Sequence, residues 1–124
     1  APYDDMGAFS GRIRVSVPRM AVGEGAATTL AMVLHELATN SLKYGALSCE
    51  EGTLDVSCDS PGETVEVVWT EQGGPEVVAP DVIGGFGSKL LQRGMDDLGG
   101  EADVAWLNSG VVVTLRMSAE RLGA

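Results

Sequence analysis

Three polar side chains in the middle of the chain have the types and the spacing of a magnesium–polyphosphate site. Glu36, Asn40 and Lys43 stand at positions i, i+4 and i+7 of the segment HELATNSLKYGA. In a helix, where each residue turns by about 100°, they share one narrow stripe. Carboxylate and amide oxygens are hard donors of the kind that Mg²⁺ takes while it keeps most of its waters. The ammonium group of Lys43 can approach phosphate oxygens as a point charge.

The same stripe also fits a solvated helix face with an incidental glutamate–lysine pattern, and the helix alone does not decide between the two. The opposite stripe is apolar and is predicted to face the core: it carries Leu30, Val33, Leu34, Leu37 and Ala38. The segment therefore predicts an amphipathic helix with a chemically unusual polar edge.

A glycine-rich loop is the second feature that could bind phosphate. The segment GGFGSKLL, residues 84–91, places Gly84, Gly85 and Gly87 just before a predicted helix. Glycines let backbone N–H groups approach a ligand closely, and a helix N-terminus offers unpaired donors. The spacing is neither a Walker motif nor a full dinucleotide fingerprint, so a flexible turn is the competing interpretation. Lys89 would then point toward phosphates or into solvent.

Glu71 is the third candidate, because it closes a strand whose neighbours of the same parity are apolar. Those neighbours are Val65, Val67 and Trp69. A carboxylate in that position could accept a hydrogen bond from an amino group such as N6 of adenine. The alternative is a strand-end acid in solvent.

Alternating and helical periodicities predict the elements that must position these residues. Strands are expected over 11–17, 52–59, 63–71, 101–107 and 110–118, and helices over 25–44 and 86–98. The order β-α-β-β-α-β-β with two hairpins predicts a two-layer α/β (α+β) sandwich, in which a mixed, mostly antiparallel sheet carries its helices on one face. Residues 1–10 are predicted to be a loose lead-in, 11–118 the domain and 119–124 a C-terminal tail.

Composition limits the partners. The 124 residues are enough for one domain, and the formal net charge of −10 argues against binding to nucleic acid or anionic membranes. No apolar run is long enough to span a bilayer. Cys49 and Cys58 lack metal-ligand spacing and indicate reduced thiols, so the predicted location is cytoplasmic.

Taken together, the motifs resemble the ATP-binding domains of histidine kinases, in the subfamily called HWE kinases. HELATNSLKYGALS resembles their N box, WTEQGGP their first glycine box and GGFGSKLL their second. The subfamily is named for a histidine in the N box, here His35, and for a Trp-x-Glu, here Trp69 and Glu71. The closing LGGEADVAWLNSGVVVTLRM resembles the family's last two strands, so the resemblance covers about residues 11–118.

The resemblance implies the Bergerat fold of the GHKL ATPase superfamily, with ATP and Mg²⁺ as cofactors. Carried over to this chain, Asn40 would bind Mg²⁺ beside the phosphates. Glu36 would order the metal or its waters, or polarise the phosphoryl acceptor as a base. Lys43 and Tyr44 would contact the phosphates, and so would Lys89.

The resemblance also assigns the adenine side of the site. Glu71 takes the position where most such ATPases use Asp to recognise adenine. Gly73, Gly85 and Gly87 would let the backbone close around the nucleotide, and Thr114 would support the adenine-binding carboxylate through a hydroxyl or a water. The segment between the glycine boxes is short, which implies a small ATP lid.

Two residues of the subfamily signature are interpreted as structural. His35 lies about 100° from Glu36 around the helix, beside the polar stripe, so we predict a histidine at the edge of the core or hydrogen-bonded to a neighbour. It is not expected to be the phosphorylated residue. Trp69 is predicted to be a packed core aromatic.

The functional expectation is the catalytic half of a two-component sensor histidine kinase. It would transfer the γ-phosphate of ATP to a histidine on a separate dimerisation domain, and a response regulator would act downstream. One alternative is a serine kinase of the anti-sigma-factor type, which shares the Glu-x-x-x-Asn pattern. Another is a degenerate docking adaptor that no longer binds ATP.

Overall fold

The computed structural model describes residues 11–17, 22–60, 62–74 and 88–123. Its strands are β1 (Ile13–Ser16), β2 (Thr53–Asp59), β3 (Thr64–Gln72), β5 (Glu101–Leu107) and β6 (Gly110–Ser118). Its helices are α1 (Glu24–Lys43), the short 3₁₀ helix η3 (Ala46–Ser48), α2 (Ser88–Asp97) and α3 (Ala119–Gly123). The order of the predicted elements is confirmed.

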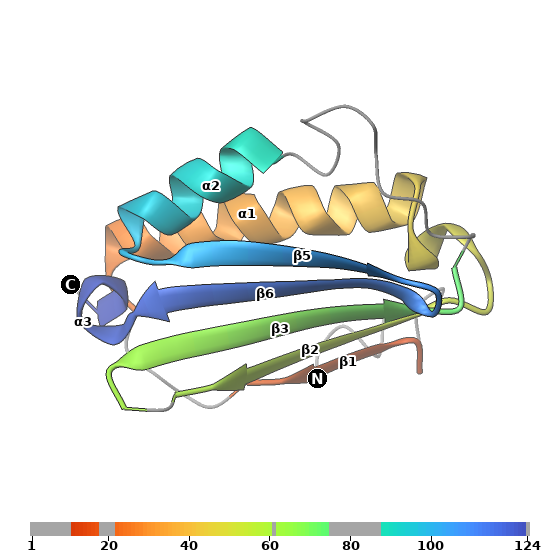
Figure 1. Cartoon of the computed structure of the whole chain (residues 1–124), viewed down its shortest axis with the longest axis horizontal. Coiled ribbons are helices and arrows are strands. Elements are labelled where there is room, and N and C mark those ends of the chain that lie inside the picture. The colour runs from red at the N-terminus through yellow and green to blue at the C-terminus, as the bar shows by residue number, and fades with distance from the viewer. Residues whose placement is uncertain (1–10, 18–21, 61, 75–87, 124) are drawn as a thin grey trace.

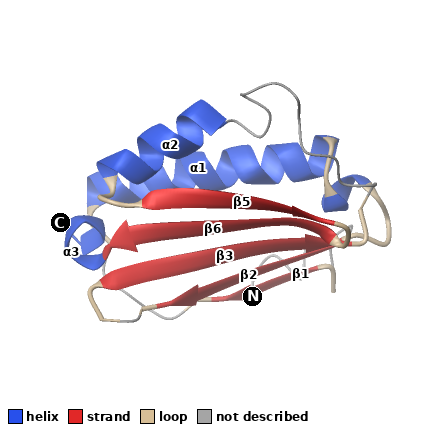
Figure 2. Cartoon of the chain, in the orientation of Figure 1, coloured by secondary structure: helices blue, strands red, loops and turns tan. Residues whose placement is uncertain are grey.

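The described strands form one mixed sheet in the order β1-β2-β3-β6-β5, so β3 is the central strand. Only the β1–β2 pair among them is parallel, and the other pairs are antiparallel. Figures 1 and 2 show α1 and α2 lying across one face of this sheet. The predicted two-layer architecture is therefore confirmed.

Along the described strands, less exposed and more exposed side chains mostly alternate, as a sheet covered on one face requires. In β3, the side chains of Val65, Val67, Trp69 and Glu71 are buried, and those between them are partly exposed. The apolar stripe of α1 covers this face, with Val33 and Leu37 fully buried. The core cluster consists of Ala26, Val33, Leu37, Leu47, Leu54, Val56, Val65, Val67, Trp69, Leu91, Met95, Leu98, Val111, Val113, Leu115, Met117 and Leu122.

A glycine sets how closely the two long helices pack. A Cβ at Gly94 of α2 would lie 2.6 Å from Cγ2 of Val33 in α1, which is closer than side chains tolerate. The missing side chain lets α2 lie against the N-terminal half of α1. The C-terminal half of α1, which carries the predicted polar stripe, is not used in this contact.

The end of the chain differs from the sequence-based prediction. The expected C-terminal tail contains α3, whose Leu122 is 2% exposed and joins the core. The carbonyl of Leu122 also accepts the N–H of Gly23 at 2.8 Å, just before α1 begins. Residues 119–123 therefore belong to the domain and hold the start of α1. The predicted lead-in, residues 1–10, lies outside the described part.

Candidate functional site

The polar stripe of α1 runs from the core to solvent. Asn40 is 8% exposed, Glu36 is half-buried and Lys43 is exposed. A solvated helix face does not account for Asn40, because its side chain is inside the protein. Its Nδ2 is buried and has no hydrogen-bond partner. A buried donor without an acceptor costs free energy and is rare, so it indicates that something else satisfies this amide.

The turn that follows α1 is fixed by hydrogen bonds to its backbone. The N–H groups of Tyr44 and Gly45 both donate to the carbonyl of Asn40, at 2.8 and 3.1 Å. The N–H of Leu47 donates to Oγ of Ser41, a fully buried hydroxyl on α1, at 3.2 Å. These backbone N–H groups therefore all have acceptors where the chain passes from α1 into η3.

Glu71, at the end of β3, contacts this turn from the side of the sheet. Its side chain is 1% exposed, at the end of the central strand on the helix-covered face. Oε1 accepts the N–H of Ala46 at 2.9 Å, and Oε2 accepts Nε1–H of Trp69 at 2.8 Å. A buried carboxylate held by two neutral donors has lone pairs left for a further donor. The alternative of a strand-end acid in solvent is wrong.

Glycines leave space around this carboxylate. A Cβ at Gly45 would overlap Oε1 of Glu71, and a Cβ at Gly74 would lie 2.6 Å from Cα of Ala46. Gly73 has a φ of 76°, which favours glycine, and its N–H donates to the carbonyl of Ser109 at 3.3 Å. The first glycine box therefore brings the end of β3 against the turn after α1.

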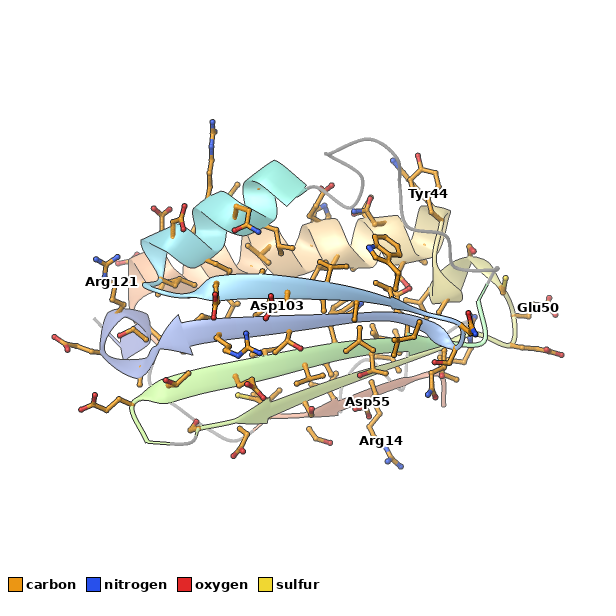
Figure 3. All side chains as sticks on the ribbon, in the orientation of Figure 1. Arg14, Tyr44, Glu50, Asp55, Asp103 and Arg121 are labelled. Carbon is orange, nitrogen blue, oxygen red and sulfur yellow. The ribbon has the colours of Figure 1, made fainter. Side chains whose placement is uncertain are left out.

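The other predicted residues either have exposed side chains or lie outside the described part of the chain. Tyr44 is 72% exposed and stands beyond the end of α1, on the side away from the sheet (Figure 3). His35 is exposed, so its predicted place at the edge of the core is not observed. Gly85, Gly87 and the side chain of Lys89 lie outside the described residues, although Lys89 belongs to the first turn of α2.

The assignment of Thr114 is wrong. Thr114 pairs with Val68 across β3 and β6, whereas Trp69 pairs with Val113. Successive residues of a strand point to opposite faces, so Thr114 lies on the open face and Glu71 on the face that the helices cover. A hydroxyl on the far side of the sheet cannot support this carboxylate.

Sequence reasoning missed three contributors to the site: the indole N–H of Trp69, the hydroxyl of Ser41 and the absent side chain of Gly45. Trp69 is buried as predicted, at 4% exposure, but it also donates to Glu71. Ser41 has a signal in the sequence, since it falls among the apolar positions of the helix. Gly45 directly follows the helix predicted over 25–44, and no local pattern reveals its contact, which is with Glu71 far away in the chain.

The described part of the chain holds no cluster of three histidine, cysteine, aspartate or glutamate side chains that would bind a metal by themselves. Mg²⁺ takes carboxylate and amide oxygens and often completes its shell with phosphates and waters. Glu36 and Asn40 offer such donors near the C-terminal end of α1, where the helix dipole favours a cation. In the same described part, no helix is both long and apolar enough to cross a membrane.

Curated relatives match most of the chain. Blue-light-activated histidine kinase 1 of Erythrobacter litoralis is 35% identical over 105 residues, which is 83% of this chain and 29% of that protein. Blue-light-activated histidine kinase of Brucella ovis is 34% identical over 118 residues, 91% of this chain and 24% of that protein. The chain thus spans less than a third of the length of these relatives. No family model matches it.

Solved structures agree on the fold. The histidine kinase domain of an Erythrobacter litoralis blue-light-activated histidine kinase superposes with a TM-score of 0.78 at 17% identity, covering 98% of this chain and 58% of that chain. By sequence, the chain belongs to the histidine kinases, and its fold is that of their catalytic domains. The catalytic domain of histidine kinase ThkA gives a TM-score of 0.67 at 17% identity, covering 88% of this chain and 80% of that one. The predicted family resemblance and the Bergerat ATP-binding fold are confirmed for this histidine kinase catalytic domain.

Proposed function

We propose that this domain binds Mg²⁺–ATP between the C-terminal half of α1 and the end of β3. The observation that carries the proposal is that a buried amide and a buried carboxylate lie on two sides of one short turn. The turn connects them, because Gly45 N–H donates to the carbonyl of Asn40 and Ala46 N–H donates to Glu71. Buried polar groups of this kind are kept where a ligand uses them.

On the adenine side, an ionised Glu71 can only accept hydrogen bonds. It would accept one from the exocyclic amino group of adenine and repel the carbonyl oxygen that guanine carries at the same position. Gly45 gives the carboxylate its room in the turn, since a Cβ there would overlap Oε1. Gly73, together with Gly85 and Gly87 of the second glycine box, would let the backbone close around the nucleotide.

On the phosphate side, Asn40 would bind Mg²⁺, and Glu36 would order the metal and its waters or act as the base. Lys43, Tyr44 and Lys89 would contact the phosphates. Lys43 also lies in the last turn of α1, where it complements the helix dipole. Its exposure therefore fits a residue that remains in solvent until the nucleotide arrives.

The reaction that we propose is transfer of the γ-phosphoryl group to a histidine on a separate dimerisation domain of the same kinase. A ring nitrogen of that histidine attacks the γ-phosphorus, the bond to the β–γ bridging oxygen breaks, and ADP leaves. Positioning and charge neutralisation account for most of the catalysis in such transfers. The curated relatives, which are longer and are named histidine kinases, support this role, and a response regulator would receive the phosphoryl group next.

The first test is calorimetric titration of the domain with a non-hydrolysable ATP analogue, with and without Mg²⁺. We expect saturable binding that Mg²⁺ strengthens. Asn40→Ala should weaken Mg²⁺-dependent binding by roughly tenfold or more. The fold should persist, since the substitution removes an amide whose Nδ2 has no partner.

Thr28→Ala is the matched control on the same helix. Its side chain is exposed, and its hydroxyl donates to the carbonyl of Glu24, one turn earlier. Unchanged Mg²⁺-dependent affinity in Asn40→Ala would contradict the metal assignment. Absence of nucleotide binding in the folded wild-type domain would instead favour the docking adaptor.

A further inference from the structure

Trp69 and Glu71 form a pair that neither the site assignment nor the resemblance explains. They are two residues apart on the central strand, so both side chains point to the helix-covered face. Nε1–H of Trp69 donates to Oε2 of Glu71 at 2.8 Å, and the exposed fractions of the two side chains are 4% and 1%. A buried hydrogen bond to a charged acceptor is among the stronger ones in proteins.

The two donors bind different oxygens of the Glu71 carboxylate. Oε2 takes the indole N–H from the same strand, and Oε1 takes the Ala46 N–H from the turn after α1. Both oxygens are therefore held in place before any ligand binds. This matters because a glutamate side chain has one more rotatable bond than an aspartate, and loss of that freedom opposes binding. A functional group is effective when neighbouring hydrogen bonds already fix its rotamer.

We propose that Trp69 is a positioning residue for base selectivity, whose indole N–H holds the Glu71 carboxylate in the rotamer that receives the amino group of the nucleobase. This inference rests on the proposed function, since it concerns the base that the site accepts. Trp69 itself lies in the core and acts through Glu71. The Trp-x-Glu spacing suits this pair because i+2 is the nearest position that shares a face of the strand with residue i.

A purely structural tryptophan would behave differently. If the ring only fills the core, its loss lowers the stability of the domain and weakens all nucleotides by the same factor. If the N–H orients Glu71, its loss changes the preference for adenine over guanine. The ratio of the two affinities therefore separates the roles.

The test compares Trp69→Phe with wild type by calorimetry, using non-hydrolysable ATP and GTP analogues with Mg²⁺. Phenylalanine keeps an aromatic ring in the core and removes the donor. We expect the preference for ATP over GTP to fall about tenfold, the size expected for one lost hydrogen bond to a charged group. Equal losses for both nucleotides would overturn the proposal.

Val67→Ala is the matched packing control. Val67 is 7% exposed on the same face of the same strand and precedes Trp69 by two residues. Its truncation should lower the stability of the domain and leave the ATP-to-GTP ratio at the wild-type value. A fall of that ratio in Val67→Ala as large as in Trp69→Phe would also contradict a specific role of the indole.

A double mutant tests whether Trp69 acts through Glu71. In a Glu71→Gln background, where the carboxylate is absent, adding Trp69→Phe should change the ratio by less than about twofold. Fully additive effects of the two substitutions on selectivity would overturn the coupling.

A measurement without nucleotide separates this inference from the proposed function. The indole N–H signal of Trp69, identified by its loss in Trp69→Phe, should move in the NMR spectrum of Glu71→Gln. A signal that does not move would overturn the pair. A wild-type domain that shows the paired signal but binds neither nucleotide would overturn the proposed function, and the selectivity role with it.

Discussion

Two carboxylates on the central strand have opposite surroundings. Glu71 lies on the helix-covered face, is 1% exposed and is held by two neutral N–H donors. Glu66 lies on the open face, where its side chain is 36% exposed and its Oε2 is 3.3 Å from Nε of Arg116. The same guanidinium is shared with Glu101 and Asp103 of the neighbouring strand.

The difference follows from strand parity. Successive side chains of a strand point to opposite faces, and Glu71 follows Glu66 by an odd number of positions, so the two lie on opposite sides of the sheet. On the open face, water competes for every charge, and ion pairs there contribute little to stability. On the covered face, the two residues that donate to Glu71 are buried with it, so water does not compete for these hydrogen bonds. We therefore expect Glu71, the carboxylate without a charged partner, to contribute more to the stability of the domain than Glu66.

Polar residues of the open face continue to its edge. Arg14 and Asp55 pair across β1 and β2 and point away from the helices (Figure 3). Because this face is solvated, water screens its charges, and their ion pairs are expected to contribute little to stability.

Removal of the buried carboxylate should have the largest effect. Glu71→Ala leaves the N–H groups of Trp69 and Ala46 without an acceptor, and each unmet buried donor costs roughly 1–3 kcal/mol. We expect the free energy of unfolding to fall by about 3 kcal/mol or more, measured by denaturant titration. Glu66→Ala, the control on the same strand, should change it by no more than about 1 kcal/mol. Similar losses for both variants would break the comparison.

A milder change at Glu71 should sharpen the comparison by acting on selectivity. Glu71→Gln keeps the shape of the side chain, but its amide NH₂ can donate to the oxygen of guanine. The NH₂ would also face either the N–H of Ala46 or that of Trp69, which both donate to Glu71 in the wild type. We expect the preference for ATP over GTP to fall about tenfold. Stability should fall by about 1–3 kcal/mol, because one buried donor loses its acceptor.

Affinities for the ATP and GTP analogues, measured by calorimetry at a temperature where the variant is folded, test this prediction. Equal weakening of both nucleotides would show that Glu71 does not recognise the base.

Crowding the carboxylate should have an intermediate effect. In Gly45→Ala the new Cβ would overlap Oε1 of Glu71 and would lie 3.0 Å from Cα of Ser41. Gly45 has a φ of −105°, so the loss comes from these contacts and not from backbone strain. We expect a loss of about 1–3 kcal/mol in stability and weaker nucleotide binding.

Gly25→Ala is the control for this substitution. A Cβ at Gly25 in the first turn of α1 meets no atom within 4 Å, so alanine should stabilise the helix by about 0.5–1 kcal/mol. Thermal unfolding of both variants shows the difference. A Gly45→Ala domain as stable as wild type would mean that Oε1 has room to move.

The smallest effect is expected on the open face. Arg116→Ala breaks all three ion pairs at once, yet these groups are accessible to water. The hydrogen bond that Arg116 donates to Asp103 raises the pKa of Arg116 above its ordinary value, so the guanidinium stays charged, and its contribution would decline only at more alkaline pH. We expect a nearly unchanged thermal midpoint and nucleotide affinity at neutral pH. A large loss in either would show that this face does more than keep the domain soluble.

Much of the fold was predictable because its elements have long, regular periodicities. The strands at 101–107 and 110–118 match β5 and β6, and the helix predicted over 25–44 is α1, Glu24–Lys43. The five-residue α3 was missed because so short a segment has no periodicity to detect, and it is helical through the packing of Leu122. Local pattern decides long elements, and tertiary contact decides short ones.

The sequence by itself determined the relations that lie within one element. Helical geometry aligned Glu36, Asn40 and Lys43, and strand parity put Trp69 and Glu71 on one face, because both periods are set by the backbone alone. Only the tertiary structure decided what these groups meet. The contact of Glu71 with Ala46 joins residues 25 positions apart, and the register of β3 against β6 places Thr114 on the far side of the sheet. Such relations depend on how elements pack and on register, where a shift of one residue exchanges the two faces, and no local pattern encodes them.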